Sequence, residues 1–111
     1  MSNQLAQELA TNLRASKTQL NTVNQQLAHL ERQEQLAKVT TQELESYPAD
    51  RVWRGCGKAF VLQDKSKYID DLSHDVGVVK EQTKALRIKK NYLETTIDKI
   101  VQNLKAMMGN H

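Results

Sequence analysis

The sequence has few of the residues that build a β-sandwich or a disulfide-stabilised domain. Its 111 residues include one proline, one cysteine, four glycines, and only one Trp, one Phe and three Tyr. A single cysteine cannot form a disulfide within the chain, and it suits a reducing compartment. So few aromatic residues cannot fill a self-sufficient β-sandwich. The composition therefore favours long helices with a narrow apolar stripe over a large enzyme core.

Charge of one sign and long apolar runs are also lacking. Lys and Arg number 16 against 13 Asp and Glu, which gives a net charge of +3 without a sustained basic stripe. Nucleic-acid binding needs such a stripe, and a membrane span needs about 18 or more consecutive apolar residues. The first residues, Met-Ser-Asn-Gln, do not resemble a signal peptide. We therefore expect a soluble, intracellular protein with no nucleic-acid or membrane partner.

The sequence predicts no catalytic, metal-binding or cofactor-binding residues. His29, His74 and His111 are scattered without metal-ligand spacing, and no phosphate-binding loop or nucleophile elbow is present. Cys56 is interpreted as a small, packed apolar residue and not as a nucleophile. We expect neither enzyme activity nor ATP hydrolysis, and no cofactor or metal.

Regular apolar spacing is the strongest feature of the sequence. Steps of three and four residues alternate without a break over positions 6–44, and again over positions 69–107. This is the a and d pattern of a heptad repeat, and it predicts two coiled-coil helices over about 3–46 and about 65–108. The first series is Ala6, Leu9, Leu13, Ser16, Leu20, Val23, Leu27, Leu30, Glu34, Ala37, Thr41 and Leu44. The second series is Ile69, Leu72, Val76, Val79, Thr83, Leu86, Lys90, Leu93, Ile97, Ile100, Leu104 and Met107.

These two helices are expected to form an antiparallel pair. Pro48 lacks an amide hydrogen and disfavours the helical conformation in the residue before it, so the first helix should end near Ser46. In the antiparallel pair, each a position meets a d position when the two residue numbers sum to 113, as in Leu13 with Ile100. Polar seam residues such as Glu34 then lie opposite apolar ones, which helps to fix this register.

The segment between the helices, about 51–63, predicts a β-hairpin. A two-residue turn at Gly57-Lys58, with glycine first, suits a type II′ turn and pairs Cys56 with Ala59. One face of this hairpin then carries Trp53, Phe60 and Leu62, with Gly55 opposite the Phe60 ring. The other face carries Val52, Arg54, Cys56, Ala59 and Val61. A turn one residue earlier or later would exchange the two faces.

Such a hairpin is not expected to be stable in a free monomer. A lone two-stranded hairpin is marginal in water, and this one has an apolar face and two unpaired edges. Pairing with hairpins of other subunits, in a barrel or sandwich between chains, would cover both. The fold class is therefore mainly α: an antiparallel two-helix coiled coil with one central β-hairpin that joins an inter-subunit β-barrel or sandwich. The residues expected to make the inter-subunit contact are Val52, Trp53, Phe60, Val61 and Leu62.

This arrangement closely resembles the β-type subunits of prefoldin. The resemblance rests on a first helix, residues 45–48 (Glu-Ser-Tyr-Pro), the hairpin of residues 52–62, and a second helix. Residues 63–68 and 89–94 look like those of a eukaryotic member. An α-type subunit would need a longer insert with two hairpins. The likeness covers almost the whole chain, so residues 1–111 are interpreted as a single prefoldin β-type domain.

The resemblance implies a fold, an assembly and an activity. It implies a cytoplasmic hetero-hexamer of two α-type and four β-type subunits, with a double β-barrel from which the coiled coils project. It also implies an ATP-independent co-chaperone that captures unfolded proteins, actin and tubulin foremost, and passes them to the cytosolic chaperonin. The expected partners are other prefoldin subunits, unfolded actin and tubulin, and that chaperonin.

No motif marks the client-contacting tips in this family, so the tip residues must be inferred from this chain itself. The e and g positions are polar in the middle of the rod but become Leu5, Ala10, Val101 and Met108 at its free end, where they should lie open. Such an apolar rim suits varied apolar segments. The alternatives are fraying helix ends or a more tightly packed tip. The expected client-binding residues are Leu5, Ala6, Leu9, Val101, Leu104, Met107 and Met108.

Further apolar residues lie off the seam nearer the hairpin. Leu36, Val39 and Val78 favour contact with a neighbouring subunit or the barrel, and ordinary surface scatter is the alternative. Two classes of function remain: a client-binding chaperone subunit, and a structural coiled-coil adaptor of a cytosolic complex without client binding. The hairpin with its aromatic face favours the chaperone subunit, because a plain tether needs only heptads.

Overall fold

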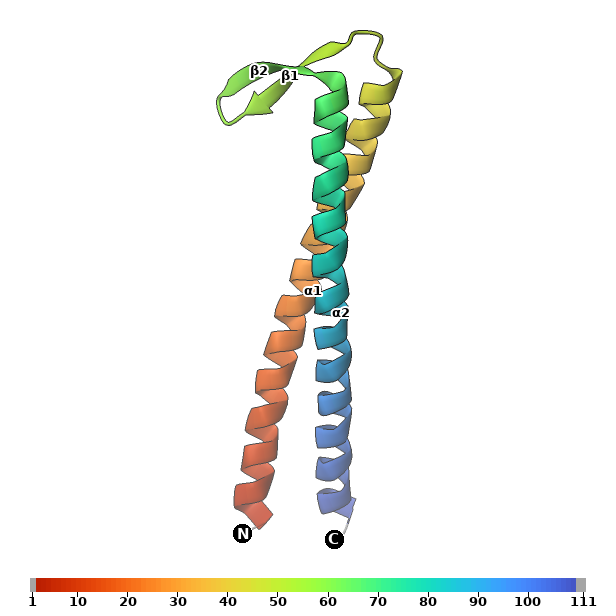
Figure 1. Ribbon diagram of the computed structural model, residues 1–111. Helices are drawn as coiled ribbons and strands as arrows, with labels where there is room; N and C mark the ends of the chain where they lie inside the picture. Colours follow the sequence, from red (N-terminus) through yellow and green to blue (C-terminus); the bar gives the residue numbers. More distant parts are fainter. Residues whose placement is uncertain (1, 110–111) are drawn as a thin grey trace. The chain divides into compact units, whose positions relative to one another are not determined.

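The computed structural model describes residues 2–109, so Met1 and His111 lie outside the described residues (Figure 1). The elements follow one another as α1 (Ser2–Ser46), β1 (Arg51–Cys56), β2 (Ala59–Asp64) and α2 (Lys65–Gly109). The chain divides into two compact units. The terminal unit combines the chain up to His29 with the chain from Lys84 onward, and the hairpin unit is Leu30–Thr83.

Backbone and side-chain hydrogen bonds join the two ends of the segment that connects the helices. Helix α1 ends at Ser46, as the proline two residues later predicted, and the amide of Tyr47 donates to the carbonyl of Leu44 at 3.2 Å. Helix α2 begins directly after β2. The amide of Lys65 donates to the carbonyl of Asp50 at 2.8 Å, and its Nζ donates to the carbonyl of Tyr47 at 2.9 Å. These bonds hold the start of β1 against the start of α2.

The heptad pattern is confirmed by burial in both units. Every a and d position of the two series is buried or half-buried. In the terminal unit, where α1 and α2 run antiparallel (Figure 1), Val23 is 1% exposed and Leu93 is 4% exposed. In the hairpin unit Leu30 is buried. Because an isolated helix gains little from propensity alone, this burial is the main stabilisation of each pair.

The expected register is supported inside the hairpin unit. Glu34 was expected opposite Val79. Its Oε1 lies 4.0 Å from Nζ of Lys80, the residue that follows Val79 in α2. The same oxygen lies 3.5 Å from Nζ of Lys38 on its own helix. Glu34, Ala37, Val76 and Val79 also line one common hollow. The half-buried carboxylate on the seam is thus neutralised by lysines from both helices.

The register of the terminal unit yields a direct prediction. Cysteines placed at Leu13 and Ile100, with Cys56 replaced by serine, should form a disulfide on mild oxidation. Disulfides require Cα atoms about 4.4–6.8 Å apart, whereas a shift of one heptad moves a residue by about 10 Å. Gel mobility without reductant measures the crosslink. Leu13 paired with Leu93 or Met107 serves as the mismatched control, and faster crosslinking in either control would reject the register.

The hairpin has the register that its turn predicted. Cys56 pairs with Ala59, Gly55 with Phe60, and the ladder continues to Arg51 and Asp64. Gly57 has a φ of 61°, and it is the only residue with positive φ in the described part of the chain. A type II′ turn requires positive φ at its first central residue alone, which glycine adopts without steric cost. The two faces of the hairpin are therefore those expected from the sequence.

Candidate subunit interface and client-binding residues

The hairpin presents one aromatic face that its own chain leaves uncovered. Trp53 is 68% exposed and Phe60 is 72% exposed, on adjacent strands. The Phe60 ring lies over Gly55, where a Cβ atom would sit 3.8 Å from the ring, an ordinary contact distance. Leu62 and Val61 are also exposed, although Val61 belongs to the opposite face. Contiguous exposed apolar surface of this kind makes the hairpin a candidate contact site.

The opposite face is turned toward the helices and is partly used within the chain. Val52 was expected in the inter-subunit contact, but it is buried at 8% exposure. It lines a hollow together with Leu44 near the end of α1, Tyr47 just after that helix, and Tyr68 of α2. The inter-subunit role of Val52 stays a prediction, although most of its side chain packs inside its own unit. Trp53, Phe60, Val61 and Leu62 remain as exposed apolar residues of the hairpin.

The expectation that Cys56 is packed needs correction. Its thiol is free and exposed, since it lies at the end of β1 beside the turn, beyond the part of the hairpin that packs on the helices. At the other end of the hairpin, Arg51 and Asp64 form an exposed ion pair with 3.7 Å between Nε and Oδ1. Asp64 therefore pairs across the strands at the position directly before α2.

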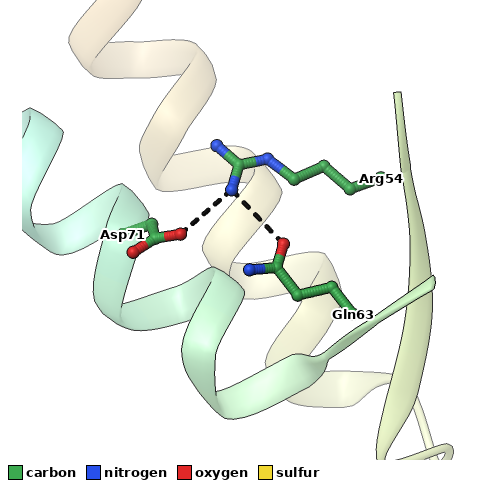
Figure 2. Close-up of polar contacts among 3 residues, drawn as sticks. All are labelled: Arg54, Gln63 and Asp71. Carbon is green, nitrogen blue, oxygen red and sulfur yellow. Dashed lines mark hydrogen bonds and ion pairs between the residues drawn. The ribbon is translucent and has the colours of Figure 1, made fainter. Parts of the chain in front are cut away.

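A polar cluster joins the hairpin to α2, and sequence reasoning missed it. Figure 2 shows Nη1 of Arg54 donating to Oδ2 of Asp71 at 3.0 Å and to Oε1 of Gln63 at 3.3 Å. The guanidinium carbon also lies 4.5 Å from the centre of the Tyr68 ring. Arg54 comes from β1, Gln63 from β2, and Tyr68 and Asp71 from the first two turns of α2. Two signs in the sequence pointed to it: Arg54 shares a strand face with Val52, and Tyr68 and Asp71 have helical spacing.

The expected tip residues lie in the terminal unit and divide into two sets. Leu5 is 51% exposed and Met108 is 75% exposed, as expected for an open rim. Ala10 and Val101, which were also expected to lie open, are half-buried. The tip thus packs more tightly than a bare a/d seam. Half-buried seam positions complete the set: Ala6, Leu9, Leu104 and Met107.

Other apolar side chains off the seam are also exposed. Leu36, Val39 and Val78 are 68%, 40% and 43% exposed in the hairpin unit. Ile88 and Tyr92, one helical turn apart on α2, are 66% and 69% exposed in the terminal unit. No helix within residues 2–109 has a stretch long and apolar enough to cross a membrane. The same residues include no group of three His, Cys, Asp or Glu side chains arranged around a metal position.

Comparison with known proteins agrees with this architecture. Residues 7–111 match the family of prefoldin subunits. Prefoldin subunit 1 of Saccharomyces cerevisiae is 64% identical over 107 residues, which cover 96% of this chain and 98% of the yeast protein. The probable prefoldin subunit 1 of Schizosaccharomyces pombe is 29% identical over 93% of both chains. The crystal structure of the prefoldin beta subunit from Thermococcus strain KS-1 superimposes with a TM-score of 0.83, at 22% identity, over 92% of this chain and 90% of the archaeal one.

Two helices joined by a single hairpin, with the fold of the archaeal beta subunit, define a β-type subunit architecture. The chain belongs to the prefoldin family. The similarity of residues 63–68 and 89–94 to a eukaryotic member agrees with the identity to the yeast subunit over nearly its full length. As a family member, the chain is a co-chaperone subunit that assembles with other prefoldin subunits.

Proposed function

We propose that this chain is one of four β-type subunits in a cytoplasmic prefoldin hexamer that also holds two α-type subunits. The observation that carries the proposal is the exposed aromatic face formed by Trp53 and Phe60. Both outer edges of the two-stranded sheet are also free within the described chain. Joining hairpins of neighbouring subunits into a β-barrel would bury the rings and satisfy the edge hydrogen bonds. The exposed thiol of Cys56 suits the reducing cytoplasm.

The second part of the proposal is capture of unfolded proteins by the free end of the terminal unit. Leu5 and Met108 offer exposed, flexible apolar side chains there, and Val101 and the seam residues beside them add a partly covered apolar surface. Methionine adapts its shape to different apolar partners. One such tip binds weakly, but several tips around one cavity raise the affinity through avidity, by about 10²–10⁴-fold.

The clients are unfolded actin and tubulin, and the recipient is the cytosolic chaperonin. Release needs no ATP, because a client leaves when it is transferred to a partner that binds it more tightly. Neither step calls for a catalytic residue or a cofactor in this chain.

The alternative is a structural coiled-coil adaptor that joins two other proteins and binds no unfolded client. An aggregation assay separates the two functions. The assembled complex, added in equimolar amount to a chemically denatured protein on dilution, should suppress light scattering to the same degree with and without ATP. An equal mass of an unrelated globular protein is the control. Scattering that rises as fast with the complex as with the control would favour the adaptor.

A further inference from the structure

We propose that Arg54 is a positioning residue that holds the hairpin against α2 before the subunit assembles. The proposal rests on the proposed role of the hairpin in assembly. It adds that the orientation of the hairpin is set inside the subunit and is not imposed by neighbouring subunits. The residues involved are Arg54, Gln63, Tyr68 and Asp71, all within the hairpin unit.

The geometry gives one guanidinium group three different partners. Its hydrogen bond to Gln63 at 3.3 Å ties β1 to β2, and its ion pair with Asp71 at 3.0 Å ties both strands to α2 (Figure 2). The Tyr68 ring supplies a cation–π contact at 4.5 Å. The side chains of Arg54 and Asp71 are 29% and 43% exposed, so water screens the pair only in part. Arginine suits this role because its planar group donates in several directions and also stacks on rings.

Few other contacts fix the angle between hairpin and helix. β2 runs into α2 without a linker, since β2 ends at Asp64 and α2 begins at Lys65. The bonds from Lys65 to Asp50 and Tyr47 hold only the base of the hairpin. Among the described residues of the hairpin, only Val52 is buried. Arg54, two residues nearer the turn, is therefore the outermost polar attachment of the hairpin to α2 among the described residues.

This attachment also decides which face points away from the helices. Successive side chains of a strand point to opposite faces, so holding Arg54 on α2 turns the adjacent Trp53 outward. A hairpin fixed in this orientation loses less conformational freedom when it joins its neighbours. Arg54 should therefore speed the association of the subunit more than it slows its dissociation.

Trp53 provides the first test, because it is the only tryptophan in the chain. Time-resolved fluorescence anisotropy of the isolated full-length chain reports how far the hairpin moves independently of the helices. Arg54→Gln should add a fast decay component that the parent chain lacks. Arg51→Gln is the matched control, because it removes the same charge from β1 but breaks only the exposed pair with Asp64. Circular dichroism confirms that the helices persist in each variant.

Charge reversal gives a second, independent variant. Arg54→Glu combined with Asp71→Arg restores the ion pair in the opposite sense, and the Gln63 amide can turn to donate to the new carboxylate. The double variant should lose most of the fast component, whereas Arg54→Glu alone should keep it. Tyr68→Leu should show the fast component in part, and Tyr68→Phe should not, because phenylalanine keeps the ring.

Assembly kinetics then test the functional consequence. On mixing with the other prefoldin subunits, Arg54→Gln should reduce the association rate by about threefold to thirtyfold, the range given by a partly exposed ion pair plus a cation–π contact. Its dissociation rate should change less than twofold.

An anisotropy decay identical to that of the parent chain, or the same change in Arg51→Gln, would overturn the proposal. So would a faster dissociation with an unchanged association rate, because Arg54 would then contact a neighbouring subunit. If the parent chain itself joins no complex, the proposed function fails, while the anisotropy result still decides the role of Arg54.

Discussion

Replacing Trp53 or Phe60 by alanine is expected to release the subunit from its complex while both helices stay folded. Both rings are more than two-thirds exposed in the single chain, so their removal should cost the isolated subunit little. In the assembled barrel they would be buried, and truncating a buried Trp or Phe costs about 3–5 kcal/mol. Such a loss weakens association by about a hundredfold to a thousandfold or more. Size-exclusion elution of the mixed subunits at micromolar concentration measures the effect.

Tyr92→Ala is the matched control for these variants. Tyr92 is 69% exposed, nearly the same as Trp53 and Phe60, but it belongs to α2 in the terminal unit and not to the hairpin unit. Its truncation should leave the elution of the complex unchanged. If the Trp53 and Phe60 variants elute like the parent complex, the hairpin does not join the subunits. If all three variants dissociate alike, loss of exposed aromatic area is the cause and the hairpin has no special role.

Removing the tips is expected to abolish client capture without preventing assembly. Deleting residues 1–9 and 103–111 removes Leu5 and Met108 with the seam residues beside them, but it leaves the whole hairpin unit and the buried Val23, Leu93 and Ile100. Made in this subunit alone, the deletion should lower the suppression of aggregation only in part, because the five other subunits of the proposed hexamer would keep their tips. The equivalent deletion in every subunit should bring suppression to background. Full activity of that complex would place client binding on the barrel or along the rods.

Point variants separate the exposed rim from simple shortening of the rod. Leu5→Ser with Met108→Ser removes the two exposed apolar side chains of the tip and keeps the helix length. Leu36→Ser is the control, because Leu36 is 68% exposed but lies in the hairpin unit. Introduced at the corresponding sites of each subunit, the tip variants should reduce suppression, and the control should not. A loss in the control alone would move client binding toward the hairpin.

The helices and the hairpin register were predictable because their determinants are local in sequence. A heptad repeat predicts which residues of a helix face its partner helix. All the predicted a and d positions are buried or half-buried, including the polar Glu34 and Lys90. The turn register followed from one glycine, because only glycine adopts the φ of 61° that Gly57 has without steric cost. Pro48 likewise fixed the end of α1.

The remaining features depend on how separate elements meet, which spacing alone does not specify. Val52 and Arg54 share a strand face, but the packing of one and the ion pair of the other depend on how that face lies on α2. Cys56 lies too far toward the turn to be covered by the helices. Ala10 and Val101 are half-buried because the tip is packed beyond its a and d seam, which the heptad pattern does not describe.

Native mass spectrometry of the chain co-expressed with the other prefoldin subunits tests the central claim most directly. Parent chain, Trp53→Ala and Tyr92→Ala should be measured side by side. The account predicts a six-subunit mass that includes this chain, with two α-type and four β-type subunits, for the parent and for Tyr92→Ala. It predicts that Trp53→Ala appears mainly as free subunit. A parent chain found only as a monomer or as an oligomer of itself, or a six-subunit complex that retains Trp53→Ala as fully as the parent, would contradict it.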